Sequence, residues 1–341
     1  MFPMTPHVVF TTERSPRHQR AALQAAPPEW RMTLHSNPGT EALYAALSDA
    51  DYLISERRGQ VDAAMLAAAP HLKLIVRLGS LAHDIDLAAA REAGVMVSMW
   101  PVGGAIRAAE HVILQMLAIS KQLRRAEEVA LNPPDDPESP RRTDENTFAY
   151  NWAGLTGIDS LWGRTVGILG FGEIGAELAR RLQGWGCTVR YHKRRPLPPE
   201  VERQLGAVYA DRATLLRESD YFVNLLPYSA ATEHLIDAAF IAQMKAGVWF
   251  VSAGSGSVID EAALVDAVRR GHVAGAALDT FEWEPLPPEN PLVAAARAGA
   301  NILLTPHIAG GTTEAARREL AQLYTPILRH LAGEPVPYRL V

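Results

Sequence analysis

The chain has 341 residues, of which 48% are hydrophobic and 21% are charged, so it is long enough for two domains of ordinary globular composition. Its net charge of −5 excludes the basic surface by which proteins bind nucleic acids. One cysteine, Cys187, excludes a disulfide framework and a cysteine-rich metal site. No apolar run reaches the roughly 18 residues of a membrane span, and the first residues lack a secretory pattern. We expect a cytoplasmic protein that acts on a small molecule, without nucleic acid, membrane or metal.

Short apolar runs alternate with Ala- and Leu-rich stretches over the first hundred residues. They predict strands at Val8–Thr11, Tyr52–Ser55, Leu74–Val76 and Val95–Ser98, and helices at Thr40–Ala50 and Val61–Ala69. Alternation at this spacing is typical of a parallel sheet with helices on both faces. The first part of the chain is therefore predicted to be an α/β unit.

A long apolar stretch without strand signals follows. It predicts one helix from about Gly104 to Leu131, ended by Asn132-Pro133-Pro134. Because its apolar residues cover more than one face, we expect this helix to be buried between domains or subunits, which favours a homodimer. The charged, proline-rich segment 132–145 is typical of a solvated loop.

A second alternating series occupies the rest of the chain. Its predicted strands are Thr165–Leu169, Thr188–His192, Tyr221–Leu225, Val248–Ser252, Gly275–Leu278 and Ile302–Leu304, and a final amphipathic helix is predicted from Thr312 to Leu331. Two units of this kind in tandem predict the α/β fold class, with two parallel sheets.

A glycine-rich turn follows the strand predicted at Thr165–Leu169. It is Gly170-Phe171-Gly172-Glu173-Ile174-Gly175, and a helical pattern continues to Leu182. Such glycines permit a tight turn and close approach of a pyrophosphate, which would lie at the helix N-terminus, where unpaired N–H groups favour an anion. Strand, turn, helix and second strand in this order predict a dinucleotide site. A purely structural glycine turn is the alternative.

The residues after the second strand bear on which dinucleotide binds. An NAD site places a carboxylate about 20 residues after the motif, where it accepts hydrogen bonds from the ribose 2′-OH. Here the sequence continues His192-Lys193-Arg194-Arg195, and its three cations can pair with a 2′-phosphate. We predict that NADP(H) is preferred and that NAD(H) is possible. The alternative is a solvated basic turn.

Several motifs resemble those of the D-isomer-specific 2-hydroxyacid dehydrogenase family, which includes glyoxylate/hydroxypyruvate reductases. They are Met244-Lys245-Ala246-Gly247, the run 275–285 (GAALDTFEWEP), Thr305-Pro306-His307-Ile308-Ala309-Gly310 and Ala109-Glu110-His111. The resemblance implies two Rossmann- or flavodoxin-like domains, with the cofactor domain inserted into the substrate domain. The implied boundaries are 1–103 plus 305–341 for the substrate (catalytic) domain and 104–304 for the dinucleotide-binding domain. The family also implies a homodimer.

The resemblance also implies roles for individual residues. His307 matches the acid/base, Glu284 the carboxylate that orients and charges it, and Asp279 the position that contacts the nicotinamide. Imidazole suits reduction of a keto group because it titrates near neutrality and can donate the proton. Further cofactor contacts are expected from Leu226, Pro227, Ala253, Gly254, His307 and Gly310.

Two segments depart from the family pattern. Ser255, in Ser252-Ala253-Gly254-Ser255-Gly256, stands at the catalytic position of an arginine that grips the substrate, and serine has neither its charge nor its bidentate fork. Losing such a pair in a closed site costs on the order of 2–5 kcal/mol. The substrate-carboxylate loop Gly-x-Gly-x-Asp is replaced by Gly79-Ser80-Leu81-Ala82-His83. We therefore expect an atypical substrate site that includes Leu78, Gly79 and Ser80.

A relocated arginine is one way to replace the missing charge. Arg107, near a position that is usually small in the family, is predicted to contact substrate, and Arg77, Arg57 and Arg58 are further candidates. The alternative for each is that it is solvated or pairs locally.

Two functions follow from these residues. The first is an NAD(P)-dependent 2-hydroxyacid dehydrogenase that reduces a 2-keto acid or related carbonyl by hydride transfer, with His307 as acid/base. The second is a cofactor-binding protein without turnover, a sensor or interaction module. His307 and Glu284 favour the first, because a binding module gains nothing from such a pair. Turnover of any keto substrate discriminates between the two.

Overall fold

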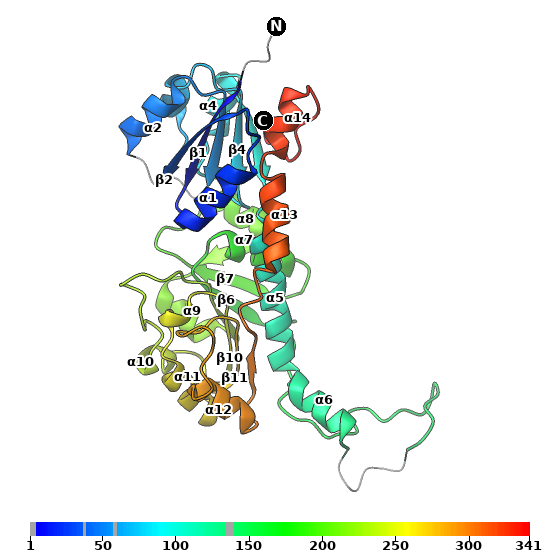
Figure 1. Ribbon diagram of the computed structural model, residues 1–341. Helices are drawn as coiled ribbons and strands as arrows, with labels where there is room; N and C mark the ends of the chain where they lie inside the picture. The colour runs from blue at the N-terminus through cyan, green and yellow to red at the C-terminus, as the bar shows by residue number, and fades with distance from the viewer. Residues whose placement is uncertain (1–4, 37–38, 57–59, 134–139) are drawn as a thin grey trace. The chain divides into compact units, whose positions relative to one another are not determined.

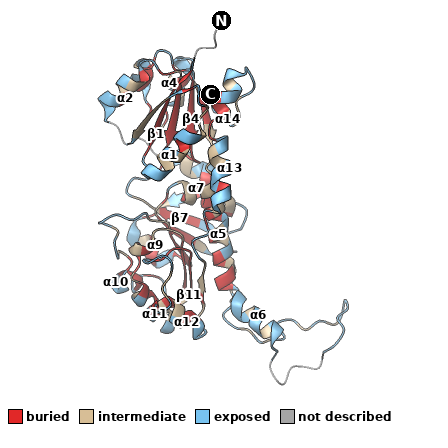
Figure 2. Cartoon of the chain, viewed as in Figure 1, coloured by how far each residue is buried: buried red, intermediate tan, exposed pale blue. Residues whose placement is uncertain are grey.

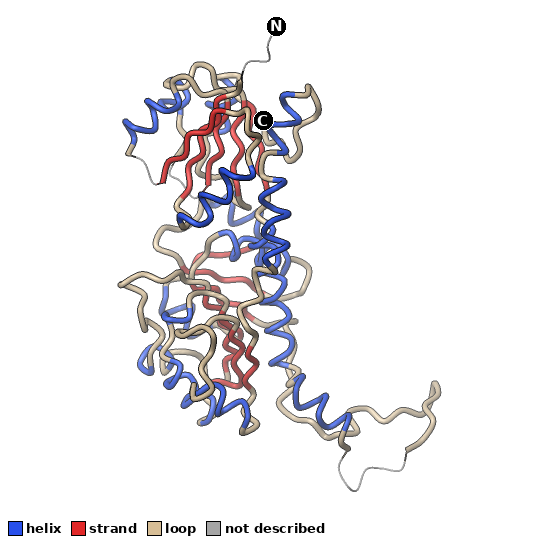
Figure 3. Tube along the Cα trace, viewed as in Figure 1, coloured by secondary structure: helices blue, strands red, loops and turns tan. Residues whose placement is uncertain are grey.

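The chain forms two compact units, Met1–Arg107 with Gly310–Val341 and Ala108–Ala309. Each has a parallel sheet and helices (Figures 1 and 3), so the predicted α/β class is confirmed. Which unit binds substrate and which binds cofactor stays a prediction. The candidate cations Arg57 and Arg58 lie outside the described residues. This computed structural model describes residues 5–36, 39–56, 60–133 and 140–341.

The first unit is built on a sheet that has five strands within the described residues, in the order β2-β1-β3-β4-β5. Arg31–Ser36 was not predicted as a strand, because this edge strand is only partly buried and so lacks an apolar pattern. The strands are β1 His7–Thr12, β2 Arg31–Ser36, β3 Tyr52–Glu56, β4 Leu74–Leu78 and β5 Met96–Trp100. The helices are α1 Pro16–Ala25, α2 Thr40–Leu47, α3 Ala63–Ala67, α4 Leu87–Glu92, α13 Thr313–Gln322 and α14 Thr325–Leu331.

Both faces of this sheet are covered, as Figure 2 shows by the red strands. Val9 of β1 packs in a cluster with residues of α2, α3 and α4, whereas Val8 and Phe10 pack in a cluster that includes Tyr324 and Ile327 near the C-terminus. Alternate residues of one strand thus enter different cores, which explains the continuous apolar run. Ligands of such sheets bind at the carboxyl ends of the strands.

The second unit has a sheet of seven parallel strands in the part of the chain that is described, in the order β12-β11-β10-β9-β6-β7-β8. This is the doubly wound order, and the strand order reverses between β6 and β9. The short edge strand β8 was not predicted. The strands are β6 Thr165–Leu169, β7 Thr188–His192, β8 Ala207–Tyr209, β9 Tyr221–Asn224, β10 Val248–Ser252, β11 Val273–Leu278 and β12 Ile302–Leu304. The helices are α7 Glu173–Leu182, α8 Pro199–Leu205, α9 Arg212–Glu218, α10 Ala238–Ile241, α11 Glu261–Arg269 and α12 Pro291–Arg297.

The prediction of one long helix from Gly104 to Leu131 was wrong. The structure has two helices, α5 Gly103–Ser120 and α6 Leu123–Leu131, because Gln122 adopts the left-handed conformation with φ 48°. Its side-chain amide donates to the carbonyl of Thr156 at 2.7 Å, which holds the break. None of the residues 123–131, all of them described, is buried within this chain, as the pale blue of α6 in Figure 2 shows, so its burial between subunits stays a prediction. Within the described residues, no helix combines the length and apolar character of a membrane span.

The predicted C-terminal helix from Thr312 to Leu331 is likewise divided. It forms α13 and α14, with Leu323 and Tyr324 between them and Pro326 in the first turn of α14. Proline has no N–H to continue the helical hydrogen bonds. The Tyr324 hydroxyl donates to the carbonyl of Ala22 at 2.7 Å, a partner that the local sequence does not reveal.

Candidate active site

Most of the predicted cofactor residues lie at one edge of the seven-stranded sheet. Gly170 follows β6, Lys193 follows β7, Ala253 follows β10 and Asp279 follows β11. Because these strands are parallel, their carboxyl ends meet at the same edge. That edge, beside the reversal between β6 and β9, is where doubly wound sheets bind ligands.

The glycine-rich turn has the geometry of a phosphate-binding loop. Gly170 has φ +87°, and a Cβ atom on it would lie 2.8 Å from the backbone nitrogen of Leu226. Among the described residues, no atom lies within 4 Å of a Cβ on Gly172, whereas one on Gly175 would lie 3.0 Å from the Phe171 ring. Gly170 thus permits the tight turn, Gly172 leaves room for a pyrophosphate, and Gly175 permits close packing at the start of the helix. Helix α7 begins directly after Gly172, where an anion is favoured.

Cations follow β7 beside this loop. Lys193 is partly buried, and Arg194 and Arg195 are exposed. Burial lowers the pKa of the Lys193 ammonium below its ordinary value, and the charge of Glu173 in the glycine-rich turn opposes that effect. A phosphate bound here would meet charged donors on flexible side chains.

The loops after β9 and β10 lie against each other. The first holds Leu226 and Pro227, and the second holds Ala253, Gly254 and Ser255. The N–H of Ser255 donates to the Leu226 carbonyl at 2.8 Å, and a Cβ on Gly254 would lie 2.7 Å from the same oxygen. The structure therefore brings these predicted cofactor contacts together, with the partly buried Ser255 on the same loop.

The imidazole of His307 contacts the carboxylate of Glu284. Nδ1 of His307 lies 2.7 Å from Oε2 of Glu284, and the other carboxylate oxygen accepts a hydrogen bond from the N–H of Phe281 at 3.1 Å. The His307 side chain is 60% exposed and that of Glu284 is 35% exposed. Glu284 is thus held on its own loop, and its contact with His307 uses Nδ1 and not Nε2.

Asp279 organises the backbone around His307. Its buried carboxylate accepts hydrogen bonds from the N–H groups of Ile308 at 3.0 Å and Ala309 at 2.8 Å. Its backbone carbonyl accepts from the N–H of His307 at 2.9 Å. His307 has φ +52°, so these bonds hold it in the left-handed region. Contact of Asp279 with a nicotinamide stays a prediction.

Three predicted substrate residues lie at the carboxyl edge of the five-stranded sheet. Leu78 ends β4, and Gly79 and Ser80 follow it. Gly79 has φ 142°, a conformation that side-chain-bearing residues avoid. Leu78 and Ser80 are both buried. Within this first unit they form a compact loop at the expected place.

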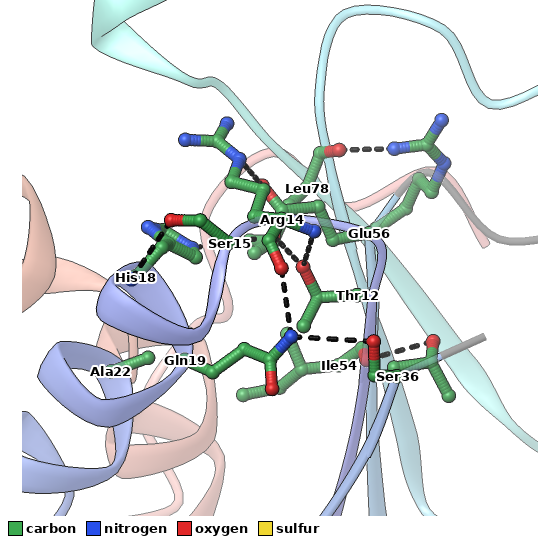
Figure 4. Close-up of polar contacts among 12 residues, drawn as sticks. Thr12, Arg14, Ser15, His18, Gln19, Ala22, Ser36, Ile54, Glu56 and Leu78 are labelled. Atoms are coloured by element: carbon green, nitrogen blue, oxygen red, sulfur yellow. Dashed lines mark hydrogen bonds and ion pairs between the residues drawn. The ribbon is translucent and has the colours of Figure 1, made fainter. Parts of the chain in front are cut away.

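A polar cluster that the sequence did not reveal surrounds Glu56 at the end of β3 (Figure 4). Glu56 is 2% exposed; its carboxylate lies 2.6 Å from Nε of Arg14, 2.8 Å from the Thr12 hydroxyl and 3.4 Å from Nε2 of His18. Burial by itself raises the pKa of this carboxyl, but His18, Arg14 and Thr12 together hold it below the ordinary value. The only signal in the sequence is a glutamate that ends an apolar strand.

Two arginines considered as relocated cations have local partners. Nε of Arg77 donates to both carboxylate oxygens of Asp84, at 3.0 and 2.9 Å. Nε of Arg107 donates to the carbonyl of Gly310 at 2.9 Å, and its guanidinium also pairs with Glu319. Both arrangements match the local pairing that was left open as the alternative to substrate binding.

Known proteins share the part of the chain that carries most of these residues. Residues 137–309 match the family described as D-isomer specific 2-hydroxyacid dehydrogenase, NAD binding domain. The chain belongs to the D-isomer-specific 2-hydroxyacid dehydrogenase family. It is 33% identical over 301 residues to glyoxylate reductase from Thermococcus onnurineus, covering 88% of this chain and 85% of that protein. The resemblance stated from the motifs is therefore confirmed.

Two further relatives extend the comparison. D-3-phosphoglycerate dehydrogenase from Mycobacterium tuberculosis is 34% identical over 302 residues, which cover 88% of this chain and 53% of that protein. The chain thus spans about half the length of that relative. The crystal structure of a glyoxylate reductase from Paecilomyes thermophila is similar, with a TM-score of 0.54 and 27% identity over 99% of this chain and 98% of that one.

The NAD-binding domain of the dehydrogenase family indicates a nicotinamide cofactor, and the residues at the sheet edge fit one. The space at Gly172 admits a pyrophosphate, and the cations follow β7, the strand that pairs with β6. His111, Gln115 and Thr305 also gather at this edge, around Asp279. His111 and Thr305 belong to motifs that resemble the family, but no pattern in the sequence indicates that these side chains contact one another.

Proposed function

We propose that this chain is an NAD(P)-dependent oxidoreductase that reduces a 2-keto acid to a 2-hydroxy acid. The observation that carries the proposal is the 2.7 Å contact between His307 and Glu284, on loops at the same sheet edge as the glycine-rich turn. Relatives named glyoxylate reductase support the substrate class. We assign the cofactor to the unit Ala108–Ala309 and the substrate loop to Leu78, Gly79 and Ser80.

The chemistry assigned to the protein is proton delivery. When bound, the nicotinamide would supply a hydride to the carbonyl carbon. His307 holds a proton on Nε2 and gives it to the carbonyl oxygen, so that the product is the alcohol and the ring is left neutral. Glu284 orients the ring through Nδ1 and stabilises its protonated form before transfer. The exposed ring then regains a proton from solvent.

We propose NADP(H) as the preferred cofactor. Lys193, Arg194 and Arg195 stand where an NAD site places a carboxylate, and they carry the charge that complements a 2′-phosphate. Arg194 and Arg195 are exposed, so they can reach a ligand without breaking a buried contact.

We also propose that the enzyme is a homodimer. The described part of α6 and of the segment that follows it exposes large apolar side chains, a feature that marks interaction surfaces. Sedimentation at micromolar concentration should give twice the 37.1 kDa mass of one chain; a single species of one chain would contradict the proposal. The exposed residues are Leu123, Leu131, Phe148, Tyr150, Trp152 and Trp162.

One assay tests the activity. Purified protein is titrated with NADPH and NADH, and the loss of reduced cofactor is then followed with glyoxylate, hydroxypyruvate, pyruvate and phenylpyruvate at saturating cofactor. We expect tight NADPH binding and oxidation by at least one acid. Binding without oxidation by any of them favours the alternative of a cofactor-binding protein without turnover, a sensor or interaction module.

A further inference from the structure

A chain of hydrogen bonds runs from helix α5 to the end of β11, inside the unit Ala108–Ala309. His111 and Gln115 lie one turn apart on α5, and Nε2 of each points to the Thr305 hydroxyl oxygen, at 3.0 and 3.4 Å. That oxygen lies 2.6 Å from Oδ1 of Asp279. The hydroxyl of Thr305 therefore bridges the helix and the carboxylate, and Nε2 of His111 also lies 3.5 Å from Oδ1 of Asp279.

The direction of each hydrogen bond follows from the chemistry of the groups. A carboxylate only accepts, so the Thr305 hydroxyl donates to Asp279. The lone pairs of that oxygen then accept from the amide of Gln115 and from His111, which carries a proton on Nε2. Each of these three hydrogen bonds thus joins a donor to an acceptor, whereas Oε1 of Gln115 has no hydrogen-bond partner among the described residues. Asp279 and Gln115 are fully buried.

The other end of this chain is the loop that carries His307. The Asp279 carboxylate accepts the N–H groups of the two residues after His307, Ile308 and Ala309. His307 itself has φ +52°, a conformation that residues with a side chain rarely adopt. The backbone direction of His307 thus depends on where the carboxylate is held.

We propose that Thr305 is a positioning residue for His307: its hydroxyl, oriented by His111 and Gln115, fixes the Asp279 carboxylate and through it the His307 loop. The Thr305 hydroxyl does not contact the His307 ring. It acts on His307 through the Asp279 carboxylate and the backbone N–H groups that this carboxylate binds. The expected effect of Thr305 on kcat rests on the proposed function. Its effect on the position of the His307 loop does not, because that loop can be observed in the protein without ligands. Displacement of a catalytic group by about 1 Å can lower a rate by on the order of 10²-fold.

Three substitutions in the 341-residue chain separate positioning from a general loss of structure. Thr305→Val keeps the shape of the side chain and removes its hydrogen bonds, whereas Thr305→Ser keeps the hydroxyl. The matched control is Thr188→Val at the exposed start of β7. Should Thr305→Val fail to fold, His111→Phe removes one donor to the hydroxyl and His111→Gln restores an amide donor.

The first measurement is amide hydrogen exchange at Ile308 and Ala309 in the protein without ligands. We expect exchange at least about tenfold faster in Thr305→Val, because a weakened hydrogen bond opens more often. Thr305→Ser and Thr188→Val should exchange like the wild type. Wild-type protection in Thr305→Val, or equal loss in Thr305→Ser, overturns the inference whether or not the protein turns over a keto acid.

The second measurement is the steady-state kinetics of the same variants. Thr305→Val should lower kcat by roughly 10- to 100-fold with KM for the keto acid within about twofold of the wild type, and Thr305→Ser should restore kcat. A wild-type kcat in Thr305→Val contradicts the inference. If the wild type reduces none of the four keto acids, the proposed function fails and hydrogen exchange alone decides the role of Thr305.

Discussion

Nδ1 of His307 lies 2.7 Å from Oε2 of Glu284, although the two residues come from separate loops at the ends of neighbouring strands. Strands β11 and β12 pair in parallel, which places the loops after them side by side. The contact uses one ring nitrogen and leaves Nε2 for chemistry. His307 and Glu284 should therefore have separable effects on proton delivery and on ring orientation.

Removing the imidazole tests proton delivery. His307→Asn should lower kcat with the best keto acid by on the order of 10²- to 10⁴-fold, the usual contribution of a general acid. The Kd of NADPH should stay within about twofold, as measured by fluorescence titration, since proton delivery is separate from cofactor affinity. Equal loss of turnover and cofactor binding would mean that His307 is structural. His71→Asn, at an exposed position in the first unit, is the control.

Neutralising the carboxylate tests ring orientation. Glu284→Gln keeps the shape of the side chain but removes the charge that favours a protonated ring, so kcat should fall by on the order of 10²-fold. The variant should melt within a few degrees of the wild type, because the side chain is 35% exposed. Glu289→Gln, on the exposed part of the same segment, should leave kcat unchanged. An unchanged kcat in Glu284→Gln would remove Glu284 from the mechanism.

Restoring the arginine tests the atypical substrate site. Ser255→Arg should raise kcat/KM for glyoxylate by roughly 30-fold or more, because a bidentate carboxylate pair in a closed site contributes on the order of 2–5 kcal/mol. Ser255→Lys, a point charge without the fork, should gain less. No gain in either variant indicates that the substrate carboxylate is not bound near this loop.

Replacing two of the cations with neutral side chains tests the cofactor preference. The double substitution Arg194→Gln and Arg195→Gln should raise the Kd of NADPH at least about tenfold, since a hydrogen bond to a charged group contributes about 1.5 kcal/mol or more. The Kd of NADH should hardly change, and the difference between the cofactors should shrink at high salt. Arg203→Gln on the exposed side of α8 is the control. NADH preference in the wild type would falsify the assignment of these residues.

The buried carboxylate of Glu56 predicts a pH dependence of stability in the first unit. Its pKa is lower in the folded protein than in the unfolded chain, where glutamate titrates near 4.3. The stabilisation is therefore present above about pH 4.3 and is lost as the pH falls through the folded-state pKa. Urea titrations between about pH 7 and 3 should show this loss.

A substitution isolates that contribution. Glu56→Gln should lower the free energy of unfolding by about 1–3 kcal/mol at neutral pH, because it replaces a buried carboxylate that accepts charged contacts from the partly exposed Arg14. It should also flatten the acid limb of the pH profile. Glu41→Gln, at an exposed position in α2, should do neither. A Glu56→Gln variant with the wild-type acid limb would show that other carboxylates cause the acid loss.

The sequence by itself determined the strands of the two sheets other than β2 and β8, the glycine-rich turn and the family. Strands buried on both faces appear as continuous apolar runs, as in β6 and β10. Both of these strands, and also β7 and β12, occupy the predicted residues. The turn requires glycine at fixed positions, so its chemistry is visible without a structure. These features are local, and a short stretch of sequence carries each of them.

Apart from the His307–Glu284 pair, which the family resemblance implied, the tertiary structure alone decided which polar groups meet. Arg107 pairs with Glu319, 212 residues away, and His111 meets Thr305 across 194 residues. The break at Gln122 depends in the same way on a distant partner, the carbonyl of Thr156. A hydrogen bond or ion pair needs only that two groups be within reach, and the folding of the chain, rather than any periodicity in it, brings them there.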